Sequence, residues 1–199
     1  MEYFLIALEE RISHYKELKF LKVFNAIESR EDPLDVVANY GLTVDLQPAD
    51  DGTDGWVKYY KEFPGGYGCY ISHYFLWEQI MSYPEDTWCC ILEDDASVED
   101  VDAFYKSQFT PDPGLDLINL NWRGINGSEA YIIKPSTAGK LVDYCKGAII
   151  APVDKLLFFL FINECDIKFE QMSCIGQASW SLESACRQNS KSNLTSADS

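Results

Sequence analysis

The hydrophobic positions of this chain fall into short apolar runs that are separated by amphipathic stretches. The runs predict strands at "YFLIAL", "KFLKVFNAI", "WCCIL", "LDLINLNW", "EAYIIK" and "IKFEQM". Helical patterning and helix boundaries predict helices at "EERISHYKEL", "PLDVVANYG", "GGYGCYISHYFLWEQIMSYPED", "PSTAGKLVDYCKG" and "PVDKLLFFLFIN". Because strands alternate with helices and "WCCIL" is almost uniformly apolar, we predict an α/β fold with a mixed, mostly parallel sheet flanked by helices.

Two regions lack such a pattern. Residues 42–67 are polar and rich in glycine and proline, which predicts a long loop or a weakly structured insertion. From about Arg187 the chain is polar and rich in serine and asparagine, which predicts a disordered tail. With 199 residues in all, the chain is therefore expected to form a single domain over residues 1–186, followed by a tail over residues 187–199.

Three consecutive acids, Glu93, Asp94 and Asp95, directly follow the "WCCIL" run. In open α/β sheets, ligands bind beyond the carboxyl ends of the strands, and a divalent cation would offset the repulsion between these carboxylates. Alternation along a strand would put Glu93 and Asp95 on one face, unless a turn redirects them. The alternative is a solvated turn, or a cap for a helix starting near "SVED". Taken alone, the three acids leave both interpretations open.

The net charge of the chain disfavours some classes of binding partner. There are 32 acidic against 16 basic residues, for a net charge of −16, and such a surface repels nucleic acid and anionic membranes. Seven cysteines without zinc-type spacing indicate free thiols in a reducing compartment. The N-terminus does not read as a signal peptide, and the longest apolar run is too short to span a bilayer. We therefore expect a cytoplasmic protein with no transmembrane segment and no nucleic-acid partner.

Several segments together carry a resemblance to a known family. In order along the chain they are "YFLIALEERISHYKEL", "VFNAIESRED", "GCYISHYFLWEQI", "CILEDDASV", "LDLINL", "GSEAYIIKPSTAGKLV" and "APVDKLL". The third has the form Gly-Cys-x-x-Ser-His-x-x-x-Trp, and the fourth contains Leu-Glu-Asp-Asp. From Tyr3 to about Leu157 the chain resembles glycosyltransferase family 25, which includes bacterial lipooligosaccharide galactosyltransferases and related collagen galactosyltransferases.

The resemblance implies a GT-A fold of Rossmann-like type and a role in glycan or lipopolysaccharide biosynthesis. The donor would be a UDP-sugar, typically UDP-galactose or a related UDP-hexose, and the acceptor a glycan or glycoconjugate. Transfer would invert the anomeric carbon, with Mn²⁺ or Mg²⁺ acting as a Lewis acid at the UDP leaving group. Glu93 to Asp95 would be the chain's version of the DxD motif that holds metal and diphosphate.

The same resemblance suggests roles for residues near the acids. Asp95 is the first candidate metal ligand and Glu93 the second, while Asp94 is a candidate for binding the ribose or the sugar hydroxyls. Arg11, in the first predicted helix, is a candidate for binding the nucleotide or its phosphates. Its alternative interpretation is an ordinary surface arginine.

Four further residues are candidates for donor binding. Asn25 and Ala26 end the second predicted strand, where a uracil or a ribose would lie, although ordinary strand packing also explains them. His73 is a candidate for contact with the donor sugar or its phosphates, and its alternative is a hydrogen-bonded packing residue. Tyr131 is expected to wall the sugar pocket.

The catalytic base is left between Glu129 and Asp154. Asp154 lies in the first turn of a predicted helix, where the helix dipole alone would stabilise a carboxylate. Many GT-A enzymes add a histidine metal ligand near the C-terminus, but the histidines here are His14 and His73. A non-catalytic GT-A-fold protein that binds a sugar or nucleotide therefore remains the alternative. A phosphoryl-transfer enzyme is a third class, for which the chain offers no P-loop.

Overall fold

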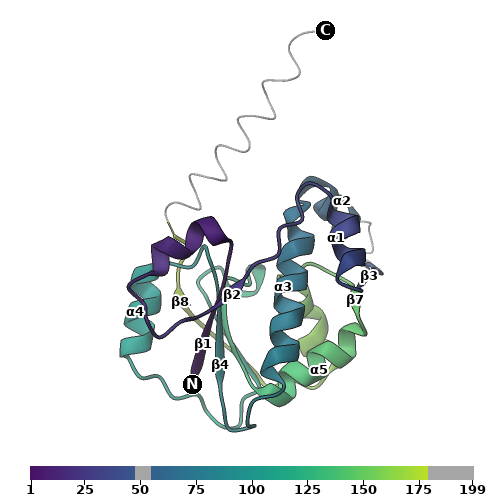
Figure 1. The fold of residues 1–199 in the computed structure, drawn as a ribbon. Coiled ribbons are helices and arrows are strands. Elements are labelled where there is room, and N and C mark those ends of the chain that lie inside the picture. Colours follow the sequence, from purple (N-terminus) through teal and green to yellow (C-terminus); the bar gives the residue numbers. More distant parts are fainter. Residues whose placement is uncertain (48–54, 179–199) are drawn as a thin grey trace.

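A six-stranded sheet in the order β2-β1-β4-β6-β5-β8 forms the centre of the molecule (Figure 1). The computed structural model describes residues 1–47 and 55–178. The strands are β1 (Glu2–Ala7), β2 (Lys22–Asn25), β4 (Cys89–Glu93), β5 (Leu117–Asn121), β6 (Ala130–Ile133) and β8 (Phe169–Ile175). β6 runs antiparallel to β4 and β5, whereas the other neighbouring pairs are parallel. The predicted mixed, mostly parallel sheet is confirmed, and the arrangement is consistent with a Rossmann-like fold.

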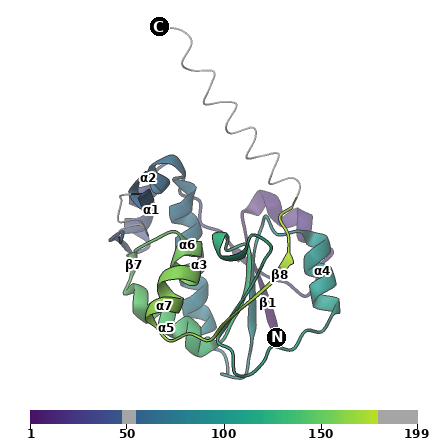
Figure 2. The ribbon, with the colours of Figure 1, turned by 180° about the vertical axis from the view of Figure 1, so that it is seen from behind.

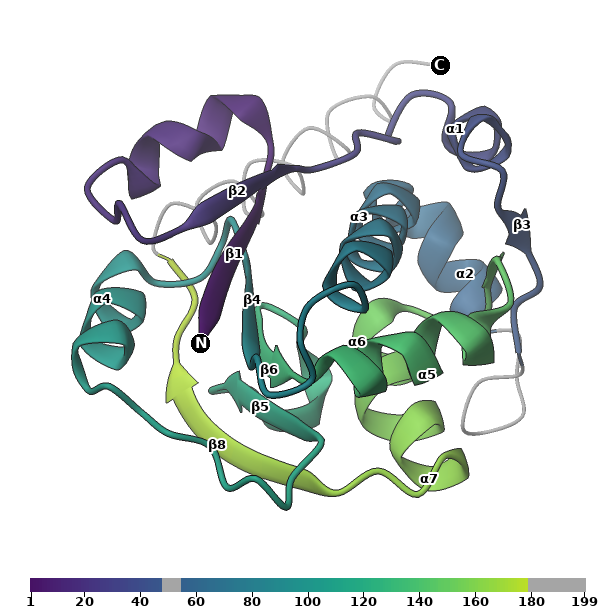
Figure 3. The same cartoon turned by 60° about the horizontal axis from the view of Figure 1, so that its bottom comes forward.

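Helices cover both faces of this sheet. α3 and α5 lie over one face, and η1 and α4 over the other (Figures 1 and 3). The view from behind shows α6 and α7 beside α3 and α5 (Figure 2). The α-helices are α1 (Pro33–Asn39), α2 (Gly55–Glu62), α3 (Gly65–Ile80), α4 (Val98–Lys106), α5 (Pro135–Cys145), α6 (Val153–Lys155) and α7 (Ile162–Glu164). The remaining elements are the 3₁₀ helices η1 (Glu9–Tyr15) and η2 (Gly124–Asn126), the π-helix η3 (Leu156–Phe161), and the short paired strands β3 (Thr43–Val44) and β7 (Ala148–Ile149).

The side chains of β4 explain why its sequence is uniformly apolar. Cys89 and Ile91 pack into the core cluster on the α3 side of the sheet. Cys90 and Leu92 pack into the separate cluster on the α4 side. Successive side chains of a strand point to opposite faces, so a strand covered on both faces needs apolar residues at every position. Burying each large side chain contributes about 1.5–3 kcal/mol to folding.

The expectation of a loop over residues 42–67 is wrong where the structure describes that region, because β3 and α2 lie within it. Trp56 and Tyr60, four residues apart on α2, are both buried. The ring of Tyr60 stacks on Tyr67 at a centroid distance of 4.2 Å, and its hydroxyl donates to the Ala151 carbonyl at 3.0 Å. α2 is therefore anchored by distant segments of the chain, which local patterning does not reveal.

A second difference is α4, which the sequence suggested only as an alternative explanation for the acids. Ser97 caps this helix by accepting a hydrogen bond from the Asp100 N–H at 3.3 Å. The residue that caps α4 is therefore Ser97 and not one of the three acids, which precede it.

Two predictions concern the ends of the chain and its location. The tail over residues 187–199 lies outside the described residues. Among the helices that the structure describes, none combines the length and the apolar character needed to cross a bilayer.

Candidate functional site

A cavity of about 190 Å³ lies where the parallel strands β1, β2 and β4 end. It is located at the carboxyl edge of the sheet, where ligands of such folds bind. The residues lining it come from β1 and the start of η1, from the segment after β2, from α3 and from the end of β4. They are Ile6, Leu8, Arg11, Ala26, Ile27, Glu28, Arg30, Gly65, Cys69, Ser72, Glu93 and Asp94.

The three consecutive acids point in three different directions. β4 ends at Glu93, and a turn follows in which the Ala96 N–H donates to the Glu93 carbonyl at 3.1 Å. The turn ends the alternation of the strand. As a result Glu93 reaches α3, Asp94 reaches η1, and Asp95 reaches Gln177 beyond β8.

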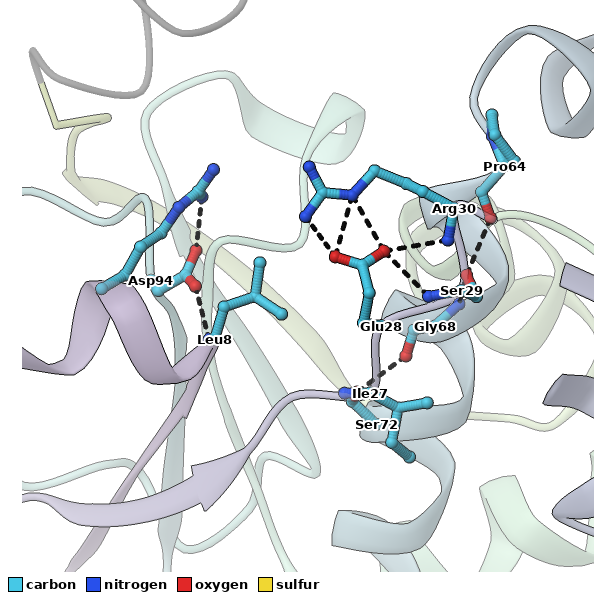
Figure 4. A network of polar contacts seen from close by, with 10 residues as sticks. Leu8, Ile27, Glu28, Ser29, Arg30, Pro64, Gly68, Ser72 and Asp94 are labelled. Atoms are coloured by element: carbon cyan, nitrogen blue, oxygen red, sulfur yellow. Dashed lines mark hydrogen bonds and ion pairs between the residues drawn. The ribbon is translucent and has the colours of Figure 1, made fainter. Parts of the chain in front are cut away.

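Asp94 is held by the start of η1. Arg11 Nη1 donates to Asp94 Oδ1 at 2.8 Å, and the Leu8 N–H donates to Oδ2 at 2.8 Å (Figure 4). Burial raises the pKa of Asp94, and the Leu8 N–H and the Arg11 charge offset this only in part. Both oxygens of Asp94 are therefore hydrogen-bonded in the wall of the cavity, with the guanidinium of Arg11 beside them.

Glu93 ends a buried chain of hydrogen bonds. Its Oε1 accepts from Ser128 Oγ at 2.6 Å and lies 3.1 Å from His73 Nε2. His73 Nδ1 lies 2.7 Å from the Tyr131 hydroxyl, which accepts from Trp77 Nε1 at 2.8 Å. The indole N–H can only donate, so the Tyr131 hydroxyl keeps its own proton for His73 Nδ1. This assigns the remaining ring proton to Nε2, which donates to Glu93.

The chain of hydrogen bonds affects the ionisation of Glu93. Burial acts to raise the pKa of Glu93, but the hydrogen bonds from His73 and Ser128, with the Arg123 charge, outweigh it and lower the pKa. Glu93 is therefore ionised at neutral pH. A fixed negative charge in a cavity wall is suited to binding a cation or the hydroxyl groups of a ligand.

Asp95 and Glu129 each leave one buried carboxylate oxygen without a partner among the described residues. Asp95 Oδ2 accepts from Gln177 Nε2 at 3.1 Å, and Glu129 Oε1 pairs with Arg123, but Asp95 Oδ1 and Glu129 Oε2 have no such bond. Burial, with the nearby charge of Glu93, raises the pKa of Asp95 to about 8 and of Glu129 to about 7. Near neutral pH Asp95 therefore holds a proton unless a cation replaces it, whereas Glu129 is protonated in about half of the molecules.

The structure brings only some of the predicted site residues to the cavity wall. Those that line it are Arg11, Ala26, Glu93 and Asp94. Those that do not are Asn25, His73, Asp95, Glu129, Tyr131 and Asp154. His73 and Tyr131 are fully buried, so that they act on the cavity through Glu93. Their predicted contacts with the donor remain predictions, as do the roles of the other residues.

Two of the residues outside the wall occupy positions that the sequence anticipated. Asn25 is the exposed last residue of β2, and the next residue, Ala26, turns into the cavity, with its N–H donating to the Ala7 carbonyl at 2.8 Å. Asp154 lies in the first turn of α6, with Lys155 Nζ 3.8 Å from its Oδ2. Burial raises the pKa of Asp154.

Sequence reasoning did not single out Glu28 and Arg30, which also line the cavity. Glu28 Oε1 accepts from the N–H groups of Ser29 and Arg30 at 2.9 Å each, and the Arg30 guanidinium pairs with the same carboxylate (Figure 4). The hydrogen bond from Arg30 lowers the pKa of Glu28 to about 2. The charged run "ESRED" directly follows a strand that ends at this edge, a signal that would have identified both residues.

Two residues of the Gly-Cys-x-x-Ser-His-x-x-x-Trp motif on α3, Gly68 and Ser72, pack the helix against the segment after β2. Gly68 lies so close to the segment after β2 that an added Cβ would be 2.0 Å from the Ile27 carbonyl oxygen. Ser72 Oγ accepts from the Ile27 N–H at 2.8 Å, and Ser29 Oγ accepts from the Gly68 N–H at 2.7 Å (Figure 4). These bonds fix α3 against the segment after β2, which lines the cavity at Ala26, Ile27 and Glu28.

Comparison with known families bears on the segment that carries both α3 and the acids. Residues 64–122 match the model of glycosyltransferase family 25 (LPS biosynthesis protein). The match confirms the predicted resemblance and supports a transferase that uses a sugar donor and an acceptor. It spans α3, β4 and β5, and therefore includes Cys69, His73 and the three acids. A comparison with curated proteins gives no match.

Proposed function

We propose that this protein is an inverting glycosyltransferase that moves a hexose, galactose or glucose, from a UDP-sugar to a hydroxyl of a glycan or glycoconjugate. The observation that carries the proposal is the cavity at the carboxyl edge of the sheet, next to the segment that matches the family. Arg11 and Arg30 both line it, beside Glu93 and Asp94. Guanidinium groups suit the phosphates of UDP, and the carboxylates suit ribose and sugar hydroxyls. The proposal includes a cytoplasmic location.

The proposal includes a Mn²⁺ or Mg²⁺ ion held by Asp95, with Glu93 as the second ligand. The buried Asp95 Oδ1, which has no hydrogen-bond partner within residues 1–47 and 55–178, fits such an ion, as does the hard oxygen character of both carboxylates. Asp94 fits less well, because both of its oxygens are already hydrogen-bonded. When bound, the ion would stabilise the negative charge that develops on the UDP leaving group.

Glu129 is the favoured base, and Asp154 the second candidate. A base works best when its pKa lies near the working pH, and the pKa of Glu129 is about 7. Its Oε2 is free of hydrogen bonds to the described residues. In the proposed step the acceptor hydroxyl gives its proton to this carboxylate, its oxygen bonds to the anomeric carbon, and the bond to UDP breaks. One displacement inverts the anomeric carbon.

The test is slow donor hydrolysis, which needs no knowledge of the acceptor. The protein is incubated with Mn²⁺ and a panel of UDP-sugars, and free UDP is measured. We expect Mn²⁺-dependent UDP release from one sugar, a loss of that release in Asp95→Asn, and its retention in Asp102→Asn. Asp102 is a suitable control because it lies on α4 in a surface pair with Lys106.

The panel also separates the two candidate classes. Binding of UDP without release from any UDP-sugar would indicate a non-catalytic GT-A-fold protein. If the protein neither binds nor hydrolyses any of the donors, the transferase proposal is refuted.

A further inference from the structure

α3 and β4 bring three different metal-ligand side chains together at the cavity, two of them in its wall and the third buried behind it. The ligand atoms of Cys69, His73 and Glu93 all lie within 4.8 Å of one another. Cys69 and His73 are four residues apart on α3, which places them on one face of the helix, one turn apart. Glu93 ends β4 opposite that face, with His73 Nε2 and Glu93 Oε1 3.1 Å apart. The spacing of the cysteines gave no hint of this group, because it contains only one of them.

The kinds of atom in this group select the metal. A thiolate sulfur, an imidazole nitrogen and a carboxylate oxygen are the ligands that Zn²⁺ takes in tetrahedral sites, whereas Mn²⁺ and Mg²⁺ favour oxygen. Catalytic zinc sites have three protein ligands and leave the fourth position open. Here Cys69 and Glu93 line the cavity, so a fourth ligand would enter from it. We propose that Cys69, His73 and Glu93 bind Zn²⁺, with the fourth position open to water or to an anionic oxygen in the cavity.

Outer hydrogen bonds already hold the ligands in place. His73 Nδ1 lies 2.7 Å from the Tyr131 hydroxyl, and this hydroxyl is fixed in turn by Trp77. Ser128 Oγ is bonded to Glu93 Oε1 at 2.6 Å. Partners of this kind orient the ligands of protein metal sites and raise their affinity.

The protons balance when the ion binds. The ring proton of His73 moves from Nε2 to Nδ1, the Tyr131 hydroxyl turns its own proton away so that its oxygen accepts from Nδ1, and Nε2 becomes free to bind the metal. The Cys69 thiol loses its proton to water as the sulfur–zinc bond forms. The imidazole stays neutral, and one proton is released for each ion bound.

The surrounding charge also favours a cation at this place. Burial raises the pKa of the Cys69 thiol, and the negative charge of Glu93 raises it further. The same negative field attracts a divalent ion, and a bound ion reverses its effect on the thiol. The zinc site goes beyond the proposed transferase activity and shares Glu93 with the proposed Mn²⁺ site.

The test uses a background variant that lacks three cysteines outside the site but keeps Cys69, His73 and Glu93. Cys165, Cys174 and Cys186 are replaced by serine in the full chain, and Zn²⁺ is titrated against a chromophoric chelator without nucleotide or Mn²⁺. We expect one Zn²⁺ per chain. Adding Cys69→Ser should raise the dissociation constant by more than about 100-fold, because losing an outer-shell partner alone costs about 10–100-fold. Circular dichroism establishes that both variants are folded.

Co²⁺ gives a second measurement that reports the thiolate directly. The background variant with Co²⁺ should show a sulfur-to-cobalt charge-transfer band, and Cys69→Ser should not. No stoichiometric Zn²⁺ binding in the background variant would overturn the proposal, as would equal affinity and an unchanged cobalt band after Cys69→Ser. Neither measurement involves a sugar donor, so a failure of the transferase proposal would leave this result intact.

Discussion

Tyr131→Phe removes one hydroxyl from the centre of the hydrogen-bonded chain below the cavity. The Tyr131 side chain is fully buried on β6, where its oxygen accepts from Trp77 Nε1 at 2.8 Å and lies 2.7 Å from His73 Nδ1. The phenylalanine ring keeps the edge-on contact with Phe158, at a centroid distance of 6.2 Å. The change therefore isolates the hydroxyl from the packing of the ring.

The loss leaves two buried polar groups, the Trp77 N–H and His73 Nδ1, without their partner. Each such group costs about 1–3 kcal/mol when it is left unsatisfied, so the free energy of unfolding should fall by about 2–6 kcal/mol. His73 would also lose the bond that fixes its tautomer and its orientation toward Glu93. We therefore expect weaker donor binding together with lower stability.

Urea unfolding followed by tryptophan fluorescence measures this change, and an unchanged m-value would show that the unfolded state is the same. Tyr144→Phe is the matched control, because the Tyr144 hydroxyl donates to Glu164 at 2.8 Å at the surface. We expect the control to lose less than about 1 kcal/mol. If Tyr131→Phe costs no more than Tyr144→Phe, the hydrogen-bonded chain does not hold His73 as described.

Three further predictions follow from the carboxyls and from the packing of α3. Without metal, the free energy of unfolding should fall as the pH rises from about 4 to about 8, because folded Asp95 and Glu129, with pKa values of about 8 and about 7, still bind protons that the unfolded chain has lost. Urea titrations across this range test it, and a flat profile would contradict it. Mn²⁺ should raise the melting temperature of the wild type but not of Asp95→Asn, while Asp102→Asn should respond like the wild type. Gly68→Ala should lower the free energy of unfolding by about 1–3 kcal/mol, because the added Cβ would meet the Ile27 backbone. Gly139→Ala on α5 is the control: the nearest atom to its added Cβ is Met81 Cβ at 4.0 Å, so the free energy of unfolding should stay the same or rise by up to about 1 kcal/mol. Equal effects of the two changes would contradict the close approach of α3.

The sequence predicts those parts of the fold that depend on burial. The run "WCCIL" indicates a strand covered on both faces, and β4 lies in the sheet as predicted. The carboxyl-edge rule then places Glu93 and Asp94 in the cavity wall. Such patterns can be recognised in the sequence because they arise from periodic contacts with a continuous core.

Other features depend on contacts between distant segments, which local patterning does not contain. The turn after Glu93 sends Asp95 toward Gln177, away from the face that strand alternation would give it. The spacing of Cys69 and His73 on α3 can be read from the sequence, but Glu93 joins them only through the packing of α3 on the sheet. In each case the partner lies too far along the chain for a local pattern to name it.

The proposed function requires the cavity at the carboxyl edge to bind the nucleotide of a sugar donor. Isothermal titration of UDP in the presence of Mn²⁺ tests this requirement, with Ala26→Trp to fill the cavity and Ala103→Trp, at an exposed position of α4, as the control. We predict that the wild type and Ala103→Trp bind UDP equally, and that Ala26→Trp binds it at least about tenfold more weakly, a loss of about 1.4 kcal/mol. Absence of UDP binding to the wild type, or unchanged binding to Ala26→Trp, would contradict the claim.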